Sequence, residues 1–138
     1  PLAEYGRRLF RQKEVPFVRL LGQVLPGLRL SQNGRVAGLC LTLRQLEEAG
    51  ALPGHTDGLV DYAIDLEGVA AAYFIRETAD GRLKASLRSL EPYHVDGVAA
   101  SLGGGGHKLA AGVTLDMPMD QAVALLEAKL AAVLEAVS

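Results

Sequence analysis

The sequence predicts an α/β domain in which helices pack on a mixed, hairpin-built sheet of about five strands. Three observations support this class. Asn33-Gly34 and Asp80-Gly81 each separate two strand-like runs, and these dipeptides favour tight hairpin turns because both central residues adopt positive φ. The C-terminal segment repeats apolar residues at helical spacing, which predicts one buried helix face: Val123, Leu126, Leu130, Val133 and Val137.

The first elements are helical. Residues 1–27 are predicted to form linker helices between domains, and residues 28–138 to form the domain itself. The N-terminal helix breaks at Pro16, which starts a second piece because proline suits the first helical turn. The first piece is rich in charge and indicates a solvated or interdomain face.

Strands and short helices follow. Strands are predicted near 28–32, 35–41, 69–77 and 82–88, with a short fifth at 112–116. Thr42 and Gln45 have the spacing of a capping box, and Gly50 suits the end of that helix. Two more short helices are predicted over 58–68 and 94–103, the latter with Asp96 as N-cap.

Composition limits the functions that the chain can have. Its 138 residues suit a single domain. A formal net charge of −2 argues against sequence-independent binding of duplex nucleic acid over a broad surface. Cys40, the single cysteine, cannot form an internal disulfide and favours a cytoplasmic location. No apolar run reaches the roughly 18 residues of a membrane span, so no membrane partner is expected.

The stretch SLGGGGHKLAAG, residues 101–112, carries the first candidate site. Successive glycine N–H groups can line a concavity that binds an anion, and KLAAG predicts a helix start whose dipole would add to it. A flexible loop is the alternative, although the neighbouring residues can pack and flexible linkers are usually polar. The pattern is neither a P-loop nor a dinucleotide fingerprint. The candidate phosphate-binding residues are Gly103, Gly104, Gly105, Gly106, His107 and Lys108.

The predicted strand at 82–89 carries the second candidate site. Side chains alternate along a strand, which sends Leu83, Ala85 and Leu87 to the core and Arg82, Lys84, Ser86 and Arg88 to the other face. The two cations nearest the turn are interpreted as an ordinary solvated face. Arg88, with Ser86, lies at the end leading to the glycine run, where a guanidinium can clamp a phosphate through two parallel hydrogen bonds.

Metal binding and nucleophilic catalysis are not expected from this chain. His55, His94 and His107 lie far apart in the sequence, and none is paired with a second ligand at zinc spacing. No nucleophile motif such as G-x-S-x-G is present. We therefore predict no catalytic residue and no metal ligand here.

These motifs together resemble a known family. GGGGHKLAAG, with SLRS upstream and HVDGVAASL between them, is similar to the C-terminal DHH-associated domain of the DHH phosphoesterases. The segment GLVDYAIDLEGVAAAYFIRETADGRLKASLRS looks like the corresponding part of the bifunctional oligoribonuclease and PAP phosphatase subfamily. The resemblance covers about residues 35–115 well and extends loosely to 1–34.

The resemblance implies a division of labour. An N-terminal DHH catalytic domain of the same polypeptide would hold two manganese ions, and this domain would hold a short oligoribonucleotide or nucleotide substrate. Phosphate binding would fall to the glycine run, His107 and Arg88, with Ser86 in support and Asp61 as a weaker substrate contact. Because the chain has no Asp-His-His, it is expected to bind no cofactor and to be inactive alone. A homodimer of the full-length protein is a further expectation.

Several other functions stay open at this point. The same domain type occurs in single-strand-specific exonucleases and in cyclic-dinucleotide phosphodiesterases. A stand-alone RNA- or nucleotide-binding module without catalysis is an alternative from a different class. A structural or dimerisation domain that uses the C-terminal helix ranks lower, because one domain needs that apolar stripe to cover its own sheet.

Overall fold

The computed structural model describes residues 14–137. Within them the strands form one six-stranded mixed sheet in the order β1-β2-β3-β4-β6-β5. The strands are β1 (Arg29–Ser31), β2 (Val36–Leu41), β3 (Ala71–Glu77), β4 (Leu83–Ser89), β5 (Gly105–His107) and β6 (Ala110–Leu115). The mixed α/β class is confirmed, and the strand beyond the predicted five is β5, which lies inside the glycine motif.

Both predicted hairpins are confirmed. β1 pairs antiparallel with β2, and β3 with β4. Asn33 and Gly34 adopt positive φ in the first turn, and Gly81 does so in the second, as tight turns require. β2 and β3 run parallel, so the chain must cross over between them, which it does through two short helices.

The helices are α2 (Val15–Val24), α3 (Leu43–Glu48), α4 (Leu59–Ile64), α5 (Asp96–Ser101) and α6 (Met119–Ala136). Pro16 lies in the first turn of α2, and the Thr42–Gln45 capping box of α3 is present with both hydrogen bonds. The predicted N-cap at Asp96 is wrong. Val95 takes that position, because it is buried and its N–H donates to the Lys108 carbonyl at 2.7 Å.

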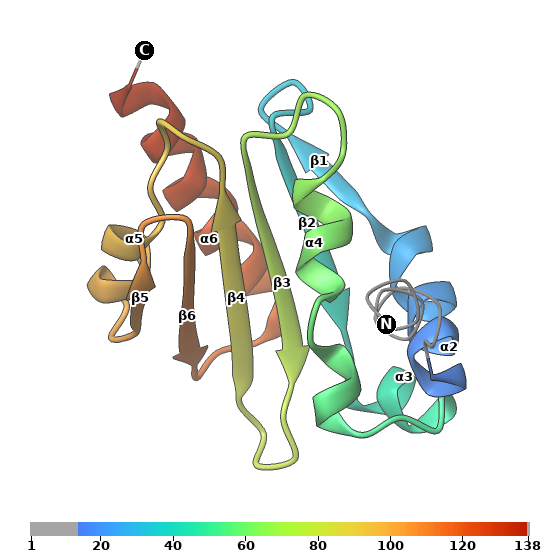
Figure 1. The fold of residues 1–138 in the computed structure, drawn as a ribbon. Coiled ribbons are helices and arrows are strands. Elements are labelled where there is room, and N and C mark those ends of the chain that lie inside the picture. Colours follow the sequence, from blue (N-terminus) through green and yellow to red (C-terminus); the bar gives the residue numbers. More distant parts are fainter. Residues whose placement is uncertain (1–13, 138) are drawn as a thin grey trace, which may run out of the picture.

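The sheet has one apolar cluster on each face. α6 covers one face, where Leu126, Leu130 and Leu134 pack against Tyr73 and Leu87, and Figure 1 shows this helix behind the sheet. Val137, predicted to belong to this stripe, is 46% exposed. On the other face α2, α3 and α4 cover β2 and β3. No side chain of β4 or β6 belongs to that second cluster, so part of this face carries no helical cover.

Helix α2 packs on the sheet through Leu20 and Val24, which are buried beside Leu39. The proposed division at residue 27 stays a prediction. The charged helical piece predicted before Pro16 lies largely outside the described residues, as do Arg7, Arg8, Arg11 and Lys13. Within 14–137 no helix combines the length and the apolar character needed to cross a membrane.

The helix predicted after the glycine run is wrong, because residues 105–115 form the antiparallel pair β5–β6. β6 also pairs with β4 from Leu83↔Leu115 to Arg88↔Ala110. This pairing imposes the two-residue period of a strand. Ala111, Val113 and Leu115 are accordingly buried in the α6 cluster. The small apolar residues of KLAAG therefore serve a central strand.

A polar network ties α6 to the sheet. The Glu127 carboxylate accepts hydrogen bonds from Arg29 Nε at 3.0 Å, Arg29 Nη2 at 3.1 Å and Tyr73 Oη at 2.5 Å. The Arg29 bonds are the main cause that holds the pKa of Glu127 below its ordinary value, while burial is the main cause that raises the pKa of Tyr73. Gly38 makes the arrangement sterically possible, since a Cβ there would lie 1.9 Å from Tyr73 Cζ.

Candidate functional site

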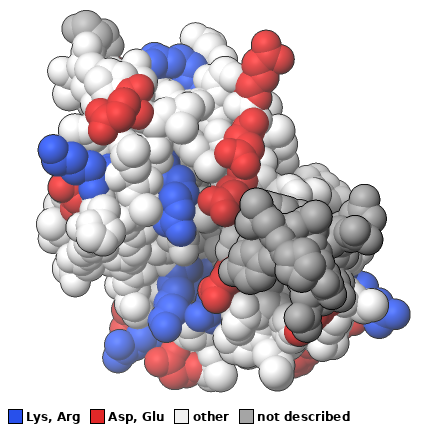
Figure 2. Space-filling model, viewed as in Figure 1, with Lys and Arg blue, Asp and Glu red and all other residues white. Residues whose placement is uncertain are grey.

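A cavity of about 620 Å³ opens beside α4 on the sheet face whose apolar cluster includes no residue of β4 or β6. Its walls come from β3, β4, β6, the segment before α4, the first turn of α4 and the start of the glycine run. Figure 2 shows Lys and Arg side chains gathered along the middle of this face, where β3 and β4 run, with acidic side chains beside them over α4. The cavity therefore has a basic wall along β3 and β4, and Asp57 is the acidic residue among its lining residues.

Strand β4 supplies most of the basic wall. The predicted alternation is confirmed: Leu83, Ala85 and Leu87 are buried in the core, whereas Lys84, Ser86 and Arg88 line the cavity. Arg88 Nη1 donates to the carbonyl oxygen of Leu87 at 2.9 Å, which fixes the guanidinium beside its own backbone. Lys84 is exposed, as predicted for a solvated face. It also lines the cavity, which the prediction of an ordinary solvated face did not include.

Arg76 of β3 is a cavity residue that the sequence analysis missed. It lines the cavity with Lys84, and the two residues are direct partners in the antiparallel β3–β4 ladder. A signal for it was present in the sequence. The Asp80-Gly81 turn sets the register of this hairpin, and that register places Arg76 opposite Lys84 on one face. Arg82, by contrast, lines a different cavity next to the hairpin turn.

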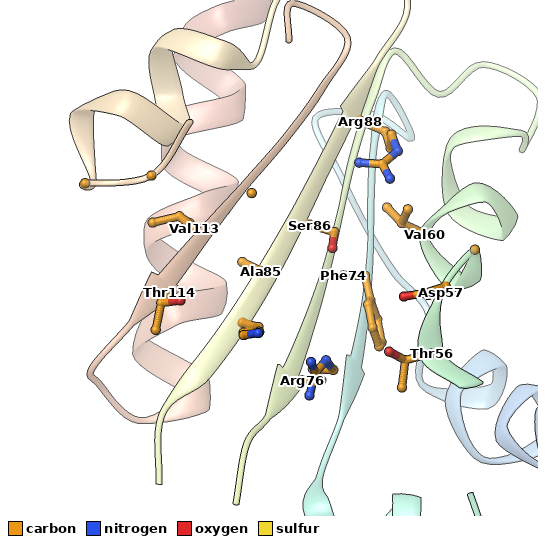
Figure 3. Close-up of a pocket in the computed structure, with 15 residues that line it drawn as sticks. Thr56, Asp57, Val60, Phe74, Arg76, Ala85, Ser86, Arg88, Val113 and Thr114 are labelled. Atoms are coloured by element: carbon orange, nitrogen blue, oxygen red, sulfur yellow. The ribbon is translucent and has the colours of Figure 1, made fainter. Parts of the chain in front are cut away.

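The opposite wall is formed by Thr56, Asp57, Gly58 and Val60. Figure 3 shows Asp57 and Thr56 across the cavity from the strand residues Ser86 and Arg76. The Thr56 hydroxyl donates to the Pro53 carbonyl at 2.7 Å, which ties this wall to the short 3-10 turn Pro53–Thr56.

Asp61, the weaker predicted contact, does not line the cavity. It lies on α4, where it is exposed. The acidic residue among the lining residues is Asp57, four positions earlier. A role for Asp61 in substrate binding stays a prediction.

Only the first two residues of the glycine run line the cavity. Gly103 and Gly104 line the cavity, but their N–H groups donate to the carbonyls of Ala100 and Ala99, at 3.1 and 2.8 Å. This is the Schellman pattern that ends a helix. These two glycines therefore offer the cavity bare backbone surface and no free N–H donors.

The later members of the motif lie on strand β5 and the turn after it. Gly105, Gly106, His107 and Lys108 are exposed and do not line the cavity. Gly106 packs closely on β6, since a Cβ there would lie 2.6 Å from Ala111 Cα. Gly105 has no atom within 4 Å of the corresponding position. A phosphate contact from these four residues stays a prediction.

The cations of the cavity have no carboxylate partner among residues 14–137. The ion pairs in that part of the chain involve Arg29, Arg44, His55 and His94. The cavity cations Arg76, Lys84 and Arg88 are in none of them, so their charge is available to an anion. The same described residues contain no group of three or more His, Cys, Asp or Glu side chains that could hold a metal ion.

Comparison with known proteins decides the family. The DHHA1 domain family matches residues 33–137. The chain belongs to the DHHA1 domain family. This confirms the resemblance seen in the glycine motif and in SLRS, and the match spans every element of the DHHA1 fold from the β1–β2 turn to α6.

Two relatives of this DHHA1 domain carry the same name, bifunctional oligoribonuclease and PAP phosphatase NrnA. The protein from Thermus thermophilus is 38% identical over 125 residues, which cover 88% of this chain and 36% of the relative. The protein from Bacillus subtilis is 30% identical over 114 residues, covering 82% of this chain and 35% of the relative. The chain thus spans a little over a third of the length of these curated relatives.

Solved structures share the DHHA1 fold. An exopolyphosphatase-related protein from Bacteroides fragilis superposes with a TM-score of 0.86 at 26% identity, over 94% of this chain and 38% of that one. A pGpG-specific phosphodiesterase from Vibrio cholerae superposes with a TM-score of 0.58 at 16% identity, over 96% of this chain and 43% of that one. At that identity the second likeness concerns the fold alone.

Proposed function

We propose that this DHHA1 domain binds the phosphate of a nucleotide or short single-stranded oligoribonucleotide and is the substrate-binding part of a phosphoesterase. One observation carries the proposal. Arg88 and Ser86 line the same cavity as Gly103 and Gly104, on a sheet face whose cations lack carboxylate partners in the described chain.

The binding chemistry follows from the types of side chain. A guanidinium offers two parallel N–H donors that match two phosphate oxygens, and Arg88 is held in place by its bond to the Leu87 carbonyl. The Ser86 hydroxyl supplies a further donor. The glycines provide close approach without a side chain. In this proposal His107 and Lys108 contact the ligand from the neighbouring edge strand.

The names of the relatives support a choice of substrates. Two relatives are named as oligoribonuclease and PAP phosphatase, so we propose short oligoribonucleotides and 3′-phosphoadenosine 5′-phosphate. A cavity of about 620 Å³ is within the usual range for small ligands, roughly 300–1,000 Å³.

Hydrolysis is assigned to a DHH catalytic domain of the same polypeptide, outside this chain. Manganese bound there would activate water and neutralise developing phosphate charge. What this chain contributes is binding and orientation of the substrate phosphate. We place the protein in the cytoplasm, because its single cysteine, Cys40, is free and half-buried and suits a reducing compartment.

The test is a titration of the isotope-labelled chain with 5′-phosphorylated diadenylate, followed by backbone amide shifts. Shifts are expected at Arg88 and over 103–108. Arg88→Gln should weaken binding by about tenfold or more, the scale of a hydrogen bond to a charged group. Arg44→Gln is the matched control, because Arg44 is on α3 and pairs with Glu48 at 3.0 Å. No amide shift near the cavity at saturating ligand would refute the proposal.

A further inference from the structure

Arg76 and Lys84 form a like-charge pair that the fold does not explain. They are direct partners across the β3–β4 ladder, and such partners have Cβ atoms only about 4.5–5.5 Å apart. Like charges directly opposite each other destabilise a sheet. On its other side Lys84 is paired with Thr114, which is neutral. A sheet that needed only solubility at this point would not require two adjacent cations.

The rest of the described structure does not neutralise the pair. No ion pair within residues 14–137 involves Arg76 or Lys84. Asp57, on the opposite wall of the same cavity, is not within ion-pair distance of either cation. The cavity side chain paired with Lys84 on its β6 side is that of Thr114, whose hydroxyl can donate a hydrogen bond to an anion.

The pair is also distant from Arg88. Lys84 and Arg88 are four residues apart on one strand, which places their Cα atoms roughly 13 Å apart at about 3.4 Å per residue. Figure 3 shows Arg88 at one end of the cavity and Arg76 at the other, with Ser86 between them. The Arg88 guanidinium is bonded to the Leu87 carbonyl and so does not extend toward Lys84. One phosphate group is too small to occupy both ends.

We propose that Arg76 and Lys84 form a second anion subsite, so that the cavity binds two phosphate groups of one ligand at once. This inference rests on the proposed nucleotide-phosphate function of the cavity. One phosphate contacts Arg88 and Ser86, and the other contacts the Arg76–Lys84 pair. The ligand class is a nucleoside that carries phosphate on both its 5′ and its 3′ oxygen.

Two of the proposed substrates share this arrangement of phosphate groups, although one is a mononucleotide and the other a dinucleotide. Adenosine 3′,5′-bisphosphate carries two phosphomonoesters across one nucleoside. A 5′-phosphorylated diadenylate carries a 5′ phosphomonoester and a 3′ phosphodiester across its first nucleoside. Both present two anionic groups at the same chemical positions, so one pair of subsites accepts either of them.

The test compares adenosine 5′-monophosphate, adenosine 3′,5′-bisphosphate and 5′-phosphorylated diadenylate by calorimetric or NMR titration of the 138-residue chain. Wild type should bind each two-phosphate ligand about tenfold or more tightly than the monophosphate, the scale of one further charge-assisted hydrogen bond. Lys84→Gln should remove this preference, because it weakens binding of the two-phosphate ligands by about tenfold or more and weakens monophosphate binding much less. Arg76→Gln should act in the same direction.

Arg82→Gln is the matched control, since it removes one positive charge from the same hairpin but outside this cavity. It should leave the preference unchanged. A second measurement separates ligand binding from folding. Because Lys84→Gln relieves a like-charge contact, its urea midpoint should equal or exceed that of wild type. A lower midpoint would show that the pair is structural and would overturn the inference.

The other possible results of the titrations also test the two proposals. If wild type binds mono- and bisphosphate equally, or if Lys84→Gln weakens both alike, the second subsite is refuted while the phosphate-binding function stands. If no ligand binds wild type at millimolar concentration, both proposals fail together.

Discussion

At the scale of single residues, the four consecutive glycines have different structural reasons. Gly103 has a φ of 91° and ends α5, a conformation that glycine adopts at little cost. Gly104 packs so closely on β6 that a Cβ would lie 2.2 Å from the Gly112 carbonyl oxygen. Gly106 is similarly close to Ala111. Gly105 has neither a positive φ nor a close neighbour, so packing does not explain it.

This difference predicts opposite results for two alanine variants. Gly104→Ala should destabilise the chain by about 2–3 kcal/mol, because its Cβ cannot fit without moving backbone. Gly105→Ala should unfold at the wild-type urea midpoint or slightly above it. It should bind 5′-phosphorylated diadenylate more weakly, because in the proposed function bare backbone at position 105 approaches the ligand. Wild-type affinity in Gly105→Ala would show that position 105 makes no such approach.

At the scale of elements, local turn and cap signals could be read from the sequence and pairing partners could not. Both hairpins and the α3 capping box follow from chemistry within a few residues. The sequence of KLAAG predicts a helix start, which is wrong, because its small apolar residues have no strong preference for a strand. What makes it a strand is β4, about 25 positions earlier in the chain.

The cavity residues, like the elements, could be predicted from the sequence only in part. Alternation along β4 identified Ser86 and Arg88 as facing away from the core. It could not tell that the buried apolar cluster on this face takes no side chain from β4 or β6, which leaves Lys84 as part of a cavity wall. Arg76 required the hairpin register as well. Burial on a sheet depends on tertiary packing, which a single strand does not encode.

The contact of α6 with the sheet gives a pH prediction. The pKa of Glu127 is lower in the folded chain than its ordinary value of 4.5. The ionised carboxylate therefore adds stability above that value, and this stability is lost as the pH falls through the lower folded pKa. Glu127→Gln should cost about 1–2 kcal/mol at pH 7, the scale of charge-assisted hydrogen bonds. Urea unfolding should show the difference shrinking toward zero in acid.

Glu48→Gln is the control for that experiment. Glu48 also pairs with an arginine at 3.0 Å, but on the exposed surface of α3. Such pairs contribute only about 0.3–0.5 kcal/mol. If the two variants lost equal stability at neutral pH, or if the Glu127→Gln deficit persisted undiminished in acid, the network with Arg29 and Tyr73 would not be what holds α6.

At the scale of the whole molecule, charge is distributed unevenly. The chain is negative overall, with a formal net charge of −2, yet three cations line one cavity. A polyanion that approaches the surface therefore meets net repulsion, whereas a ligand small enough to enter the cavity meets mainly its basic wall. Beyond about 8 Å at physiological ionic strength the repulsion is screened, so size discrimination should be strongest at low salt.

This distribution predicts a preference for short ligands over duplex nucleic acid. At about 50 mM salt, labelled 5′-phosphorylated diadenylate should bind saturably, while a duplex of about 20 base pairs should show no saturable binding tighter than roughly 10⁻⁴ M, the weak end of non-specific affinity. Fluorescence anisotropy at about 50 and 200 mM salt measures both. A duplex affinity that falls steeply with salt would mean that the chain neutralises many phosphates at once, as extended basic surfaces do. Three cavity cations cannot do this, so that result would place the main nucleic-acid contact outside the cavity.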